Sequence, residues 1–288
     1  MVDETIELGS SGVQVSRLGM SARGLIALGC SEREATVAVR HALDGGVTLF
    51  DVADVDGFGL GEELLSRALG INRFHVTVAT KFGIAWDESG RTWREISPAR
   101  VRIALEASLR RLRLESIPLY YIQGFDGNAL LADVLGELER CREQGKIRAS
   151  GLTAFEDADL LSARGSAAID ALQIPHSLSN ASDYDAVASL AKQIGASLIA
   201  CESIDAAASI AAVQGIARRM DHSPAQVALR WTLQSPGVGA VLFEASRPAE
   251  VDECLGATDW RLDTADYHML TQFVSQADRQ RQPLPLAA

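Results

Sequence analysis

Two charged residues directly follow short apolar runs, at positions where a side chain could act in catalysis. Asp51 follows the run 48–50, and Lys81 follows the run 78–80. Burial of an isolated charge is costly unless a partner compensates it. An aspartate and a lysine on neighbouring strands are able to pair, and such a pair tunes the pKa of a proton donor beside it. The alternative is a salt bridge that closes the end of a barrel and has no catalytic role.

Other polar residues also stand at the ends of apolar runs, and we predict that they contact a substrate. Arg23 follows the first run, and its guanidinium is suited either to binding a carboxylate or phosphate or to pairing with nearby acids. Glu202 follows the seventh run, and His176 lies just past the sixth as a further acid or base. Trp86, after the third run, is expected to line an apolar substrate pocket or to pack its own loop down.

The elements that position these residues alternate regularly along the chain. Eight apolar runs rich in Val, Ile and Leu lie at 17–20, 47–50, 76–80, 117–122, 148–152, 168–174, 197–200 and 239–243. Helical patterns lie between them at 32–43, 97–112, 129–143, 186–194 and 224–233. Eight strand–helix repeats without a linker predict one (β/α)₈ TIM barrel, in which the active site lies at the C-terminal ends of the strands.

The ends of these elements carry local signals. An N-terminal β-hairpin with a Gly/Ser turn is predicted at 5–15. Ser97 and Ser223 each precede a proline, which places a capping hydroxyl before the first helical residue. A doubly wound open sheet is the competing fold, but no GxGxxG follows an early strand. We therefore predict one barrel domain over 1–277 and a disordered tail over 278–288.

Composition excludes several classes of partner. The chain has 288 residues, with 27 Lys and Arg against 38 Asp and Glu, so the formal net charge is −11. Nucleic acids and anionic membranes require a basic surface. No stretch approaches the roughly 20 apolar residues of a membrane span, and the first residues lack the apolar core of a secretory signal. Four widely spaced cysteines without metal-ligand spacing are typical of a reduced cytoplasmic protein. We expect a small-molecule substrate; the sequence does not determine the oligomeric state.

Several stretches resemble motifs of the aldo-keto reductases and follow one another in that family's order. The most specific stretch, at 50–65, reads F-D-V-A-D-V-D-G-F-G-L-G-E-E-L-L and is similar to the family's second-strand motif. Further similar stretches lie at 106–112, 118–123, 145–148, 151–153 and 251–257. The resemblance implies the same barrel, and it implies a site built for hydride transfer from NADP(H) to a carbonyl group.

The resemblance also implies a catalytic tetrad of Asp, Tyr, Lys and His, in which the Tyr protonates the carbonyl oxygen. Asp51 and Lys81 match this tetrad, whereas Asp56 stands at the Tyr position and Gln123 at the His position. An Asp has an ordinary pKa of about 3.9, against about 10 for a Tyr, so it does not replace the phenol as an acid. Beside Lys81 the carboxyl group is expected to ionise, and Gln123 forms hydrogen bonds without carrying a proton.

These replacements favour non-redox acid–base chemistry, such as dehydration or isomerisation of a carbonyl-bearing metabolite. Asp56 would be the general base, with Lys81 as acid or electrostatic partner. Two alternatives remain. One is an NADP(H)-dependent carbonyl reductase that takes its proton from another donor, such as His176 or water. The other is a catalytically silent ligand-binding protein on the same scaffold.

The cofactor positions that the resemblance implies are only partly kept. Compatible residues are Thr153, Gln173, Ser246, Arg247 and Glu253. Carboxylates stand where the family has a ring-stacking residue, a phosphate loop and a glycine, at Glu202, Asp205 and Glu244. The family's Asn after Thr153 is Ala154. Because carboxylates repel a pyrophosphate, we expect no required cofactor and a weakened affinity for NADP(H).

Overall fold

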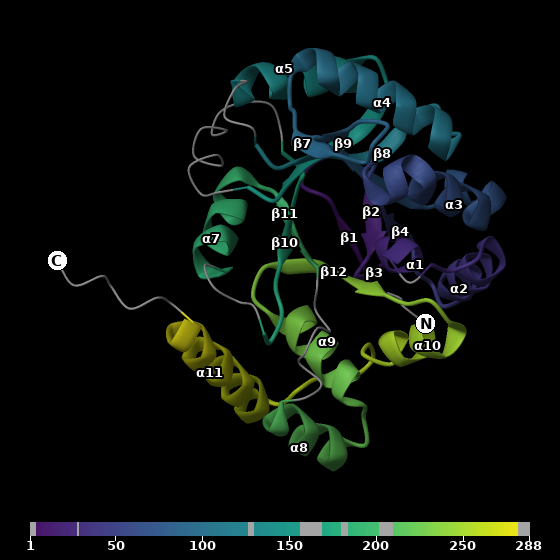
Figure 1. Ribbon diagram of the computed structural model, residues 1–288. Coiled ribbons are helices and arrows are strands. Elements are labelled where there is room, and N and C mark those ends of the chain that lie inside the picture. The colour runs from purple at the N-terminus through teal and green to yellow at the C-terminus, as the bar shows by residue number, and fades with distance from the viewer. Residues whose placement is uncertain are drawn as a thin grey trace.

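A computed structural model describes residues 4–27, 29–125, 130–155, 169–179, 184–201 and 210–281, without the side chains of 275–281. Eight parallel strands close into a barrel, and the helices surround them (Figure 1). In barrel order the strands are β3 (Leu18–Ser21), β4 (Leu49–Asp51), β5 (Thr77–Phe82), β8 (Ile117–Gln123), β9 (Ile147–Thr153), β10 (Ala171–Pro175), β11 (Ser197–Cys201) and β12 (Val238–Glu244). The predicted (β/α)₈ barrel is confirmed.

The outer layer consists of one short helix and nine longer ones among the described residues. These are α1 (Arg23–Ala27), α2 (Glu32–Asp44), α3 (Leu60–Leu69), α4 (Pro98–Leu112), α5 (Leu131–Glu143), α7 (Tyr184–Ile194), α8 (Ala211–Met220), α9 (Pro224–Gln234), α10 (Pro248–Leu255) and α11 (Thr264–Arg281). The predicted caps are present, because the Ser97 and Ser223 hydroxyls accept hydrogen bonds from backbone N–H groups in the first turns of α4 and α9. Helix α11 continues four residues past 277, and 282–288 lie outside the described residues.

Two hairpins lie at opposite ends of the barrel. The predicted N-terminal hairpin pairs β1 (Thr5–Glu7) with β2 (Gln14–Ser16). Its apolar residues pack into the barrel interior and close the N-terminal end. A second hairpin, β6 (Ile84–Trp86) with β7 (Thr92–Arg94), follows β5 where the sequence indicated a loop. It extends from the C-terminal end of β5, so it stands beside the open mouth of the barrel.

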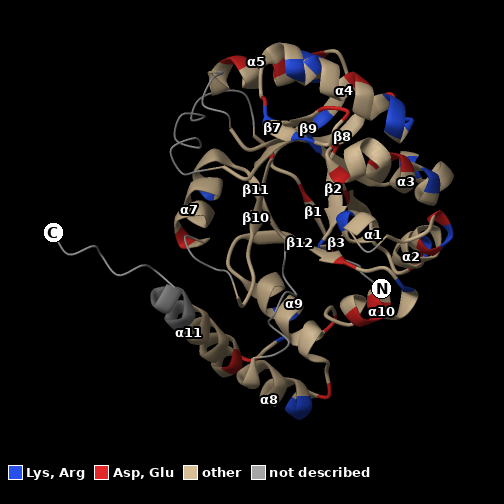
Figure 2. Cartoon of the chain, viewed as in Figure 1, with Lys and Arg blue, Asp and Glu red and all other residues tan. Residues whose placement is uncertain are grey.

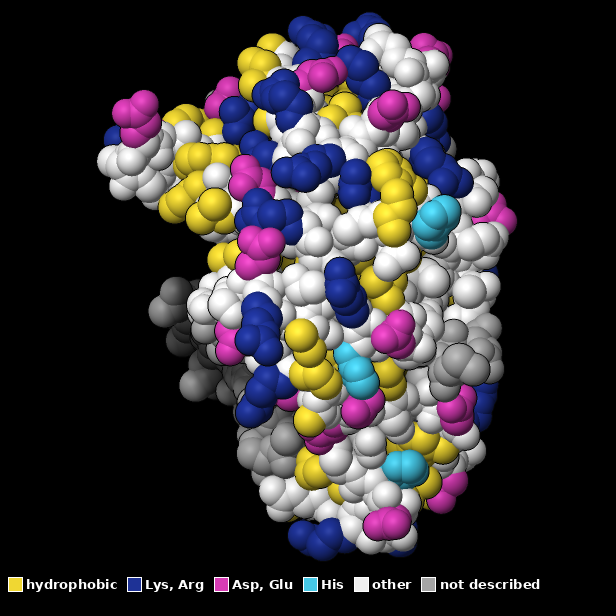
Figure 3. Space-filling view, turned by 90° about the vertical axis from the view of Figure 1, so that its right-hand side faces the viewer, with side chains coloured by type: hydrophobic (Ala, Val, Ile, Leu, Met, Phe, Trp, Pro, Cys, Tyr) yellow, Lys and Arg dark blue, Asp and Glu magenta, His cyan; other side chains and the backbone are white. Residues whose placement is uncertain are grey.

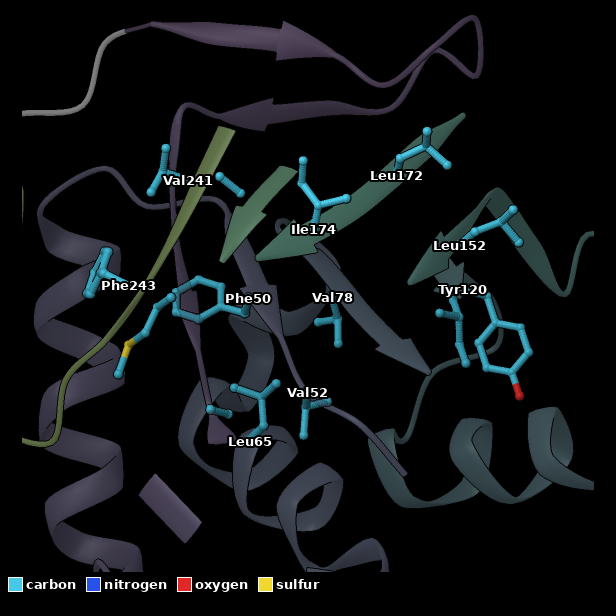
Figure 4. Close-up of a cluster of buried hydrophobic side chains, with 14 of the residues drawn as sticks. Phe50, Val52, Leu65, Val78, Tyr120, Leu152, Leu172, Ile174, Val241 and Phe243 are labelled. Atoms are coloured by element: carbon cyan, nitrogen blue, oxygen red, sulfur yellow. The ribbon is translucent and has the colours of Figure 1, made fainter. Parts of the chain in front are cut away.

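Strand alternation decides which side chains enter the barrel. Leu49 and Ala79 belong to the interior cluster, whereas Phe50 and Val78 belong to the cluster between strands and helices (Figure 4). Since successive strand residues face opposite sides, Asp51 follows Leu49 onto the interior face, and Lys81 follows Ala79. The same period places Gln123 inside, two residues after Tyr121. The strand ends therefore direct polar groups into the mouth.

Charged residues lie mainly on the outer helices and loops, and most of the strand ribbon is free of them (Figure 2). On the face seen in Figure 3, Asp and Glu lie among the Lys and Arg side chains, which are more numerous in the upper part of the view. None of the described helices is long and apolar enough to cross a membrane.

Candidate active site

A cavity of about 390 Å³ opens at the C-terminal ends of the strands. Its lining residues are Ser21, Arg23, Asp51, Ala53, Val55, Asp56, Lys81, Gln123, Thr153, Ala154, Gln173, Pro175, Cys201, Leu242 and Glu244. All four predicted catalytic residues are among them, together with the predicted substrate contact Arg23 and the predicted cofactor contacts Thr153 and Gln173. The cavity therefore brings together most of the residues that the strand ends predicted.

Asp51 and Lys81 form a buried ion pair at the floor of this cavity. Lys81 Nζ donates to Asp51 Oδ1 at 2.5 Å and to the Val52 carbonyl at 3.0 Å. The two residues are 5% and 7% exposed. The Lys81 ammonium also lies 5.6 Å from the centroid of the Tyr121 ring. These contacts fix a positive charge under the cavity, and breaking the pair would leave a buried charge without compensation.

Asp56 begins the short 3₁₀ turn η1 (Asp56–Gly59), five residues after the last residue of β4. Its Oδ2 accepts a hydrogen bond from the Ala53 N–H at 2.8 Å. Burial raises the pKa of this carboxyl group above its ordinary value, and the Ala53 hydrogen bond and the charge of Lys81 only partly oppose that effect. The predicted influence of Lys81 is therefore present, but desolvation is the larger effect on this pKa. A carboxylate with a raised pKa is a stronger base than an ordinary Asp.

Two glutamine side chains face the cavity with unused acceptors. Gln123 Oε1 and Gln173 Oε1 are buried, and neither has a hydrogen-bond partner among the described residues. Gln123 is the last residue of β8, beside Thr153 at the end of β9. Gln173 lies on β10, which also pairs with Thr153. A buried acceptor without a partner is destabilising, so both amides are suited to receiving a hydrogen bond from a bound molecule.

Charges of both signs stand at the rim. Arg23 begins α1 and is exposed, and its charge partly opposes the rise in the pKa of Asp56. Glu244 ends β12, paired in register with Ser21. A Cβ atom added at Gly24 would lie 3.0 Å from the Glu244 carboxylate, so the absence of a side chain at Gly24 makes room for that acid. The rim therefore presents a cation and a carboxylate close together.

Two predicted substrate contacts do not line this cavity. His176 is 2% exposed and packs outward, with its ring 3.8 Å from that of Tyr184 and 4.9 Å from that of Trp231. Its Nε2 lies 2.9 Å from Ser235 Oγ, and burial lowers the pKa of His176 to about 4. The strand-end position placed His176 near the mouth, but the packing of α7 and α9 turns its ring away from the cavity.

Trp86 lies instead on the β6–β7 hairpin. Its ring is 5.9 Å from that of Phe58 and 6.0 Å from the Arg100 guanidinium. Phe58 is half exposed and adopts a left-handed backbone conformation with φ of +57°. These contacts pack the hairpin down, in agreement with the second role weighed for Trp86, and its contact with a substrate stays a prediction. Glu202 and Asp205 lie outside the described residues.

Two of the predicted cofactor contacts, Ser246 and Arg247, bind another residue of the same chain. Glu250 accepts hydrogen bonds from the Ser246 N–H at 2.8 Å and the Ser246 hydroxyl at 2.9 Å, and it pairs with the Arg247 guanidinium. The Ser246 backbone hydrogen bond is the main cause that lowers the pKa of Glu250 to about 2. Glu253 is exposed on α10. Ser246 and Arg247 therefore already bind a carboxylate of this chain, that of Glu250.

A polar cluster behind the mouth escaped the sequence analysis. Asp54 is 1% exposed, and neither of its carboxylate oxygens has a hydrogen-bond partner among the described residues. Burial is the main cause that raises the pKa of Asp54 to about 8, and the nearby negative charge of Glu62 is the next. Glu62, fully buried on α3, accepts from Thr80 Oγ1 at 2.7 Å and Arg111 Nε at 2.5 Å. The sequence held one signal of this cluster. Thr80 faces the helices rather than the barrel interior, and a buried polar side chain at such a position requires a hydrogen-bond partner.

The fold and the site define a member of one family of barrel enzymes. The model of the aldo/keto reductase family matches residues 18–209 and 204–275, and the chain belongs to that family. A curated relative from Glycine max, a probable aldo-keto reductase 1, is 27% identical, and the match covers 96% of this chain and 90% of the relative.

Solved structures agree with this assignment. The glycerol dehydrogenase AKR11B4 from Gluconobacter oxydans matches with a TM-score of 0.88 and 25% identity over the whole of both chains. An aldo-keto reductase from Klebsiella pneumoniae, solved in complex with NADPH, matches with a TM-score of 0.80 and 21% identity over 100% of this chain and 98% of that one. The second likeness supports the fold alone.

Proposed function

We propose that this protein is a non-redox enzyme that moves a proton on a carbonyl-bearing small metabolite, by dehydration, isomerisation or a related reaction. The observation that carries the proposal is the position of Asp56. A carboxyl group with a raised pKa, rather than a phenol, lines the cavity beside the Asp51–Lys81 pair. No Tyr or His lines the cavity among the described residues. That arrangement is suited to removing a proton from a carbon next to a carbonyl group.

In this mechanism Asp56 takes the proton as its carboxylate form. The carbonyl oxygen then gains negative charge, which the fixed ammonium of Lys81 stabilises. Asp51 holds Lys81 in place, and the amide of Gln123 donates a hydrogen bond to the same oxygen. With an α-hydroxy carbonyl substrate, transfer of the hydroxyl proton to the former carbonyl oxygen and return of the proton from Asp56 to the former carbonyl carbon gives isomerisation. With a β-hydroxy carbonyl substrate, delivery of the proton from Asp56 to the departing hydroxyl gives water and an unsaturated carbonyl compound.

The rim residues set which substrates enter. Arg23 is placed to bind a carboxylate or phosphate group of the substrate, because its guanidinium offers a planar set of donors. Trp86 with Phe58 would cover an apolar part of the same molecule. Glu202 remains a predicted contact, outside the described residues.

The family implies NADP(H), and the two ends of its site fit that cofactor unequally. At the nicotinamide end, the Gln173 acceptor lacks a partner among the described residues and is able to accept from a carboxamide N–H, and Thr153 lies beside it. At the phosphate end, Glu244 places a carboxylate at the rim, while Ser246 and Arg247 already surround Glu250. Anions bind where free N–H groups and positive charge meet. The phosphate end therefore fits a dinucleotide poorly, and the mechanism above uses no cofactor.

The second candidate is an NADP(H)-dependent carbonyl reductase with an altered proton donor. It is favoured by the unused Gln173 acceptor and by the NADPH complex of the structurally similar Klebsiella pneumoniae protein. The buried His176 does not line the cavity, so the donor in that case would be water.

The experiment is a screen across several classes of carbonyl compound. Nucleotide-free protein is incubated in D₂O with a panel of small aldehydes, ketones and hydroxy-carbonyl compounds, and loss of protons next to the carbonyl is followed by NMR. The proposal expects catalysed exchange or conversion of at least one compound. Consumption of NADPH with these compounds, without exchange in its absence, would support the reductase. Ligand binding without either reaction would support the silent binding protein.

A further inference from the structure

A second cavity, of about 250 Å³, lies at the opposite end of the barrel from the candidate active site. Its lining residues are Glu4, Arg17, Arg230, Leu233, Thr258, Asp259, Trp260 and Arg261. Arg17 directly precedes β3, whereas Ser21 at the other end of that strand lines the mouth. The second cavity is therefore separated from the first by the length of a barrel strand.

Arg230 is the unusual residue of this cavity. It is 7% exposed, and the guanidinium donates one hydrogen bond among the described residues, to the Ala257 carbonyl at 3.5 Å. Its Nε is buried and has no acceptor within the described part of the chain. Two other inward guanidiniums each face a buried carboxylate: Arg111 pairs with Glu62, and Arg142 pairs with Asp170. A buried guanidinium without such a partner carries an uncompensated desolvation cost.

The surrounding charges do not supply the missing anion. Arg17 and Arg261 line the same cavity, and both act with burial to lower the pKa of Arg230 to about 10. Glu4 pairs with Arg17 at 3.1 Å, and Asp259 is exposed at the rim. Three guanidiniums thus face two carboxylates, and the most buried guanidinium has no ion-pair partner among the described residues.

The wall beside Arg230 is held in place by its own contacts. The Trp260 indole N–H donates to the Gly256 carbonyl at 2.9 Å, and its ring stacks on His222 at a centroid distance of 4.0 Å. Arg17 donates to the carbonyls of Leu233, Val238 and Gly239, which anchors the opposite wall. Such pre-formed walls lower the cost of ordering a site when a ligand binds.

We propose that this cavity is a binding site for a small oxyanion, the carboxylate or phosphate group of a metabolite, held by Arg230 and Arg261. The anion supplies the partner that Arg230 lacks among the described residues and offsets the excess positive charge. The volume lies below the usual range of about 300–1,000 Å³ for drug-sized ligands, so the site fits a small anion rather than a nucleotide. The proposal is independent of the reaction at the other end of the barrel.

The test uses inorganic phosphate and succinate as probes, titrated into the full chain at constant ionic strength with KCl as the balancing salt. Binding is measured by calorimetry and by the rise in melting temperature. We expect saturable binding of at least one probe, and the tighter probe distinguishes a phosphate group from a carboxylate. Arg230→Met removes the buried charge at nearly constant volume and is expected to weaken binding at least about tenfold.

Two further variants keep the test decisive if Arg230→Met does not fold. Arg261→Gln changes an exposed residue of the cavity and is expected to weaken binding, whereas Arg40→Gln removes an exposed charge from α2 and is expected to leave it unchanged. Absence of saturable binding to the wild type would overturn the proposal. So would equal affinities for the wild type, Arg230→Met and Arg261→Gln, because the anion would then bind elsewhere.

Discussion

The two sides of the barrel mouth differ in how their charges are satisfied. On the side of β4, β5 and β8, Lys81 and Asp51 pair with each other. Asp56, whose pKa is raised, and Gln123, whose side-chain oxygen has no hydrogen-bond partner among the described residues, also face the cavity. On the side of β12 and α10, Glu250 accepts a hydrogen bond from Ser246 and pairs with Arg247, two residues predicted to contact a cofactor. Under the proposed function, proton transfer and cofactor binding depend on separate groups in this barrel. In that proposal the first set carries the reaction, whereas the donors of the second set are already bound to Glu250.

The largest expected effect tests the first side directly. Asp56→Asn keeps the shape of the side chain but removes its basicity, so turnover of any substrate found in the screen should fall by about 10²–10⁴. The NMR exchange assay measures the loss. Asp133→Asn, an exposed acid in the first turn of α5, is the matched control and should retain full activity. Equal activity of Asp56→Asn and the wild type would contradict the assignment of Asp56 as the base.

The ion pair beneath Asp56 is expected to matter for stability as well. Lys81→Met leaves Asp51 buried without its partner, which should lower the free energy of unfolding by about 3–5 kcal/mol. Chemical denaturation measures this change. The double variant Asp51→Asn with Lys81→Met should recover part of the loss, since the uncompensated charge is gone.

The exposed pair of Lys146 with Glu106 provides the comparison for that result. Both side chains are substantially exposed, so Lys146→Met should cost no more than about 1 kcal/mol. A similar loss for Lys81→Met and Lys146→Met would show that burial of the Asp51–Lys81 pair has no energetic consequence.

On the cofactor side, a substitution is expected to increase binding, whereas the substitutions above decrease activity or stability. Glu244→Gly removes a rim carboxylate, so the affinity for NADPH should rise about tenfold, measured by fluorescence titration at fixed salt. Glu244→Gln removes the charge but keeps a side chain of nearly the same size. Comparing the two variants therefore separates electrostatic repulsion from lack of space. If both variants bind NADPH no more tightly than the wild type, Glu244 does not limit cofactor binding.

A further effect concerns Asp54 behind the mouth. Its pKa is raised to about 8 in the folded protein, so the folded state holds a proton that the unfolded chain has released. Stability therefore falls as the pH rises from about 4 to about 8. Asp54→Asn should flatten this dependence, because the amide does not titrate. Parallel denaturation curves at pH 5 and pH 8 measure the difference, and an unchanged slope in the variant would assign the pH dependence to other groups.

The barrel and the floor of its cavity were predictable because they follow local rules. Period-two alternation and the strand-end position place Asp51, Lys81 and Gln123 in the mouth whatever the packing around them. The caps at Ser97 and Ser223 likewise depend only on neighbouring residues. These features required no long-range information.

The features that were missed depend on contacts between distant segments. The outward orientation of His176 follows from Tyr184 and Trp231, which lie on α7 and α9. The raised pKa of Asp56 is an effect of desolvation, which no sequence spacing reports. The occupation of Ser246 by Glu250 depends on how the first turn of α10 folds back on the end of β12.

The most direct test of the central claim, that the proton-transfer side works without the cofactor side, is the rate of carbonyl α-proton exchange by wild-type protein with and without millimolar NADPH. The account predicts the same exchange rate in both samples, with no NADPH consumed. Exchange or conversion that appears only when NADPH is present, with one NADPH oxidised for each substrate converted, would contradict it and identify a reductase.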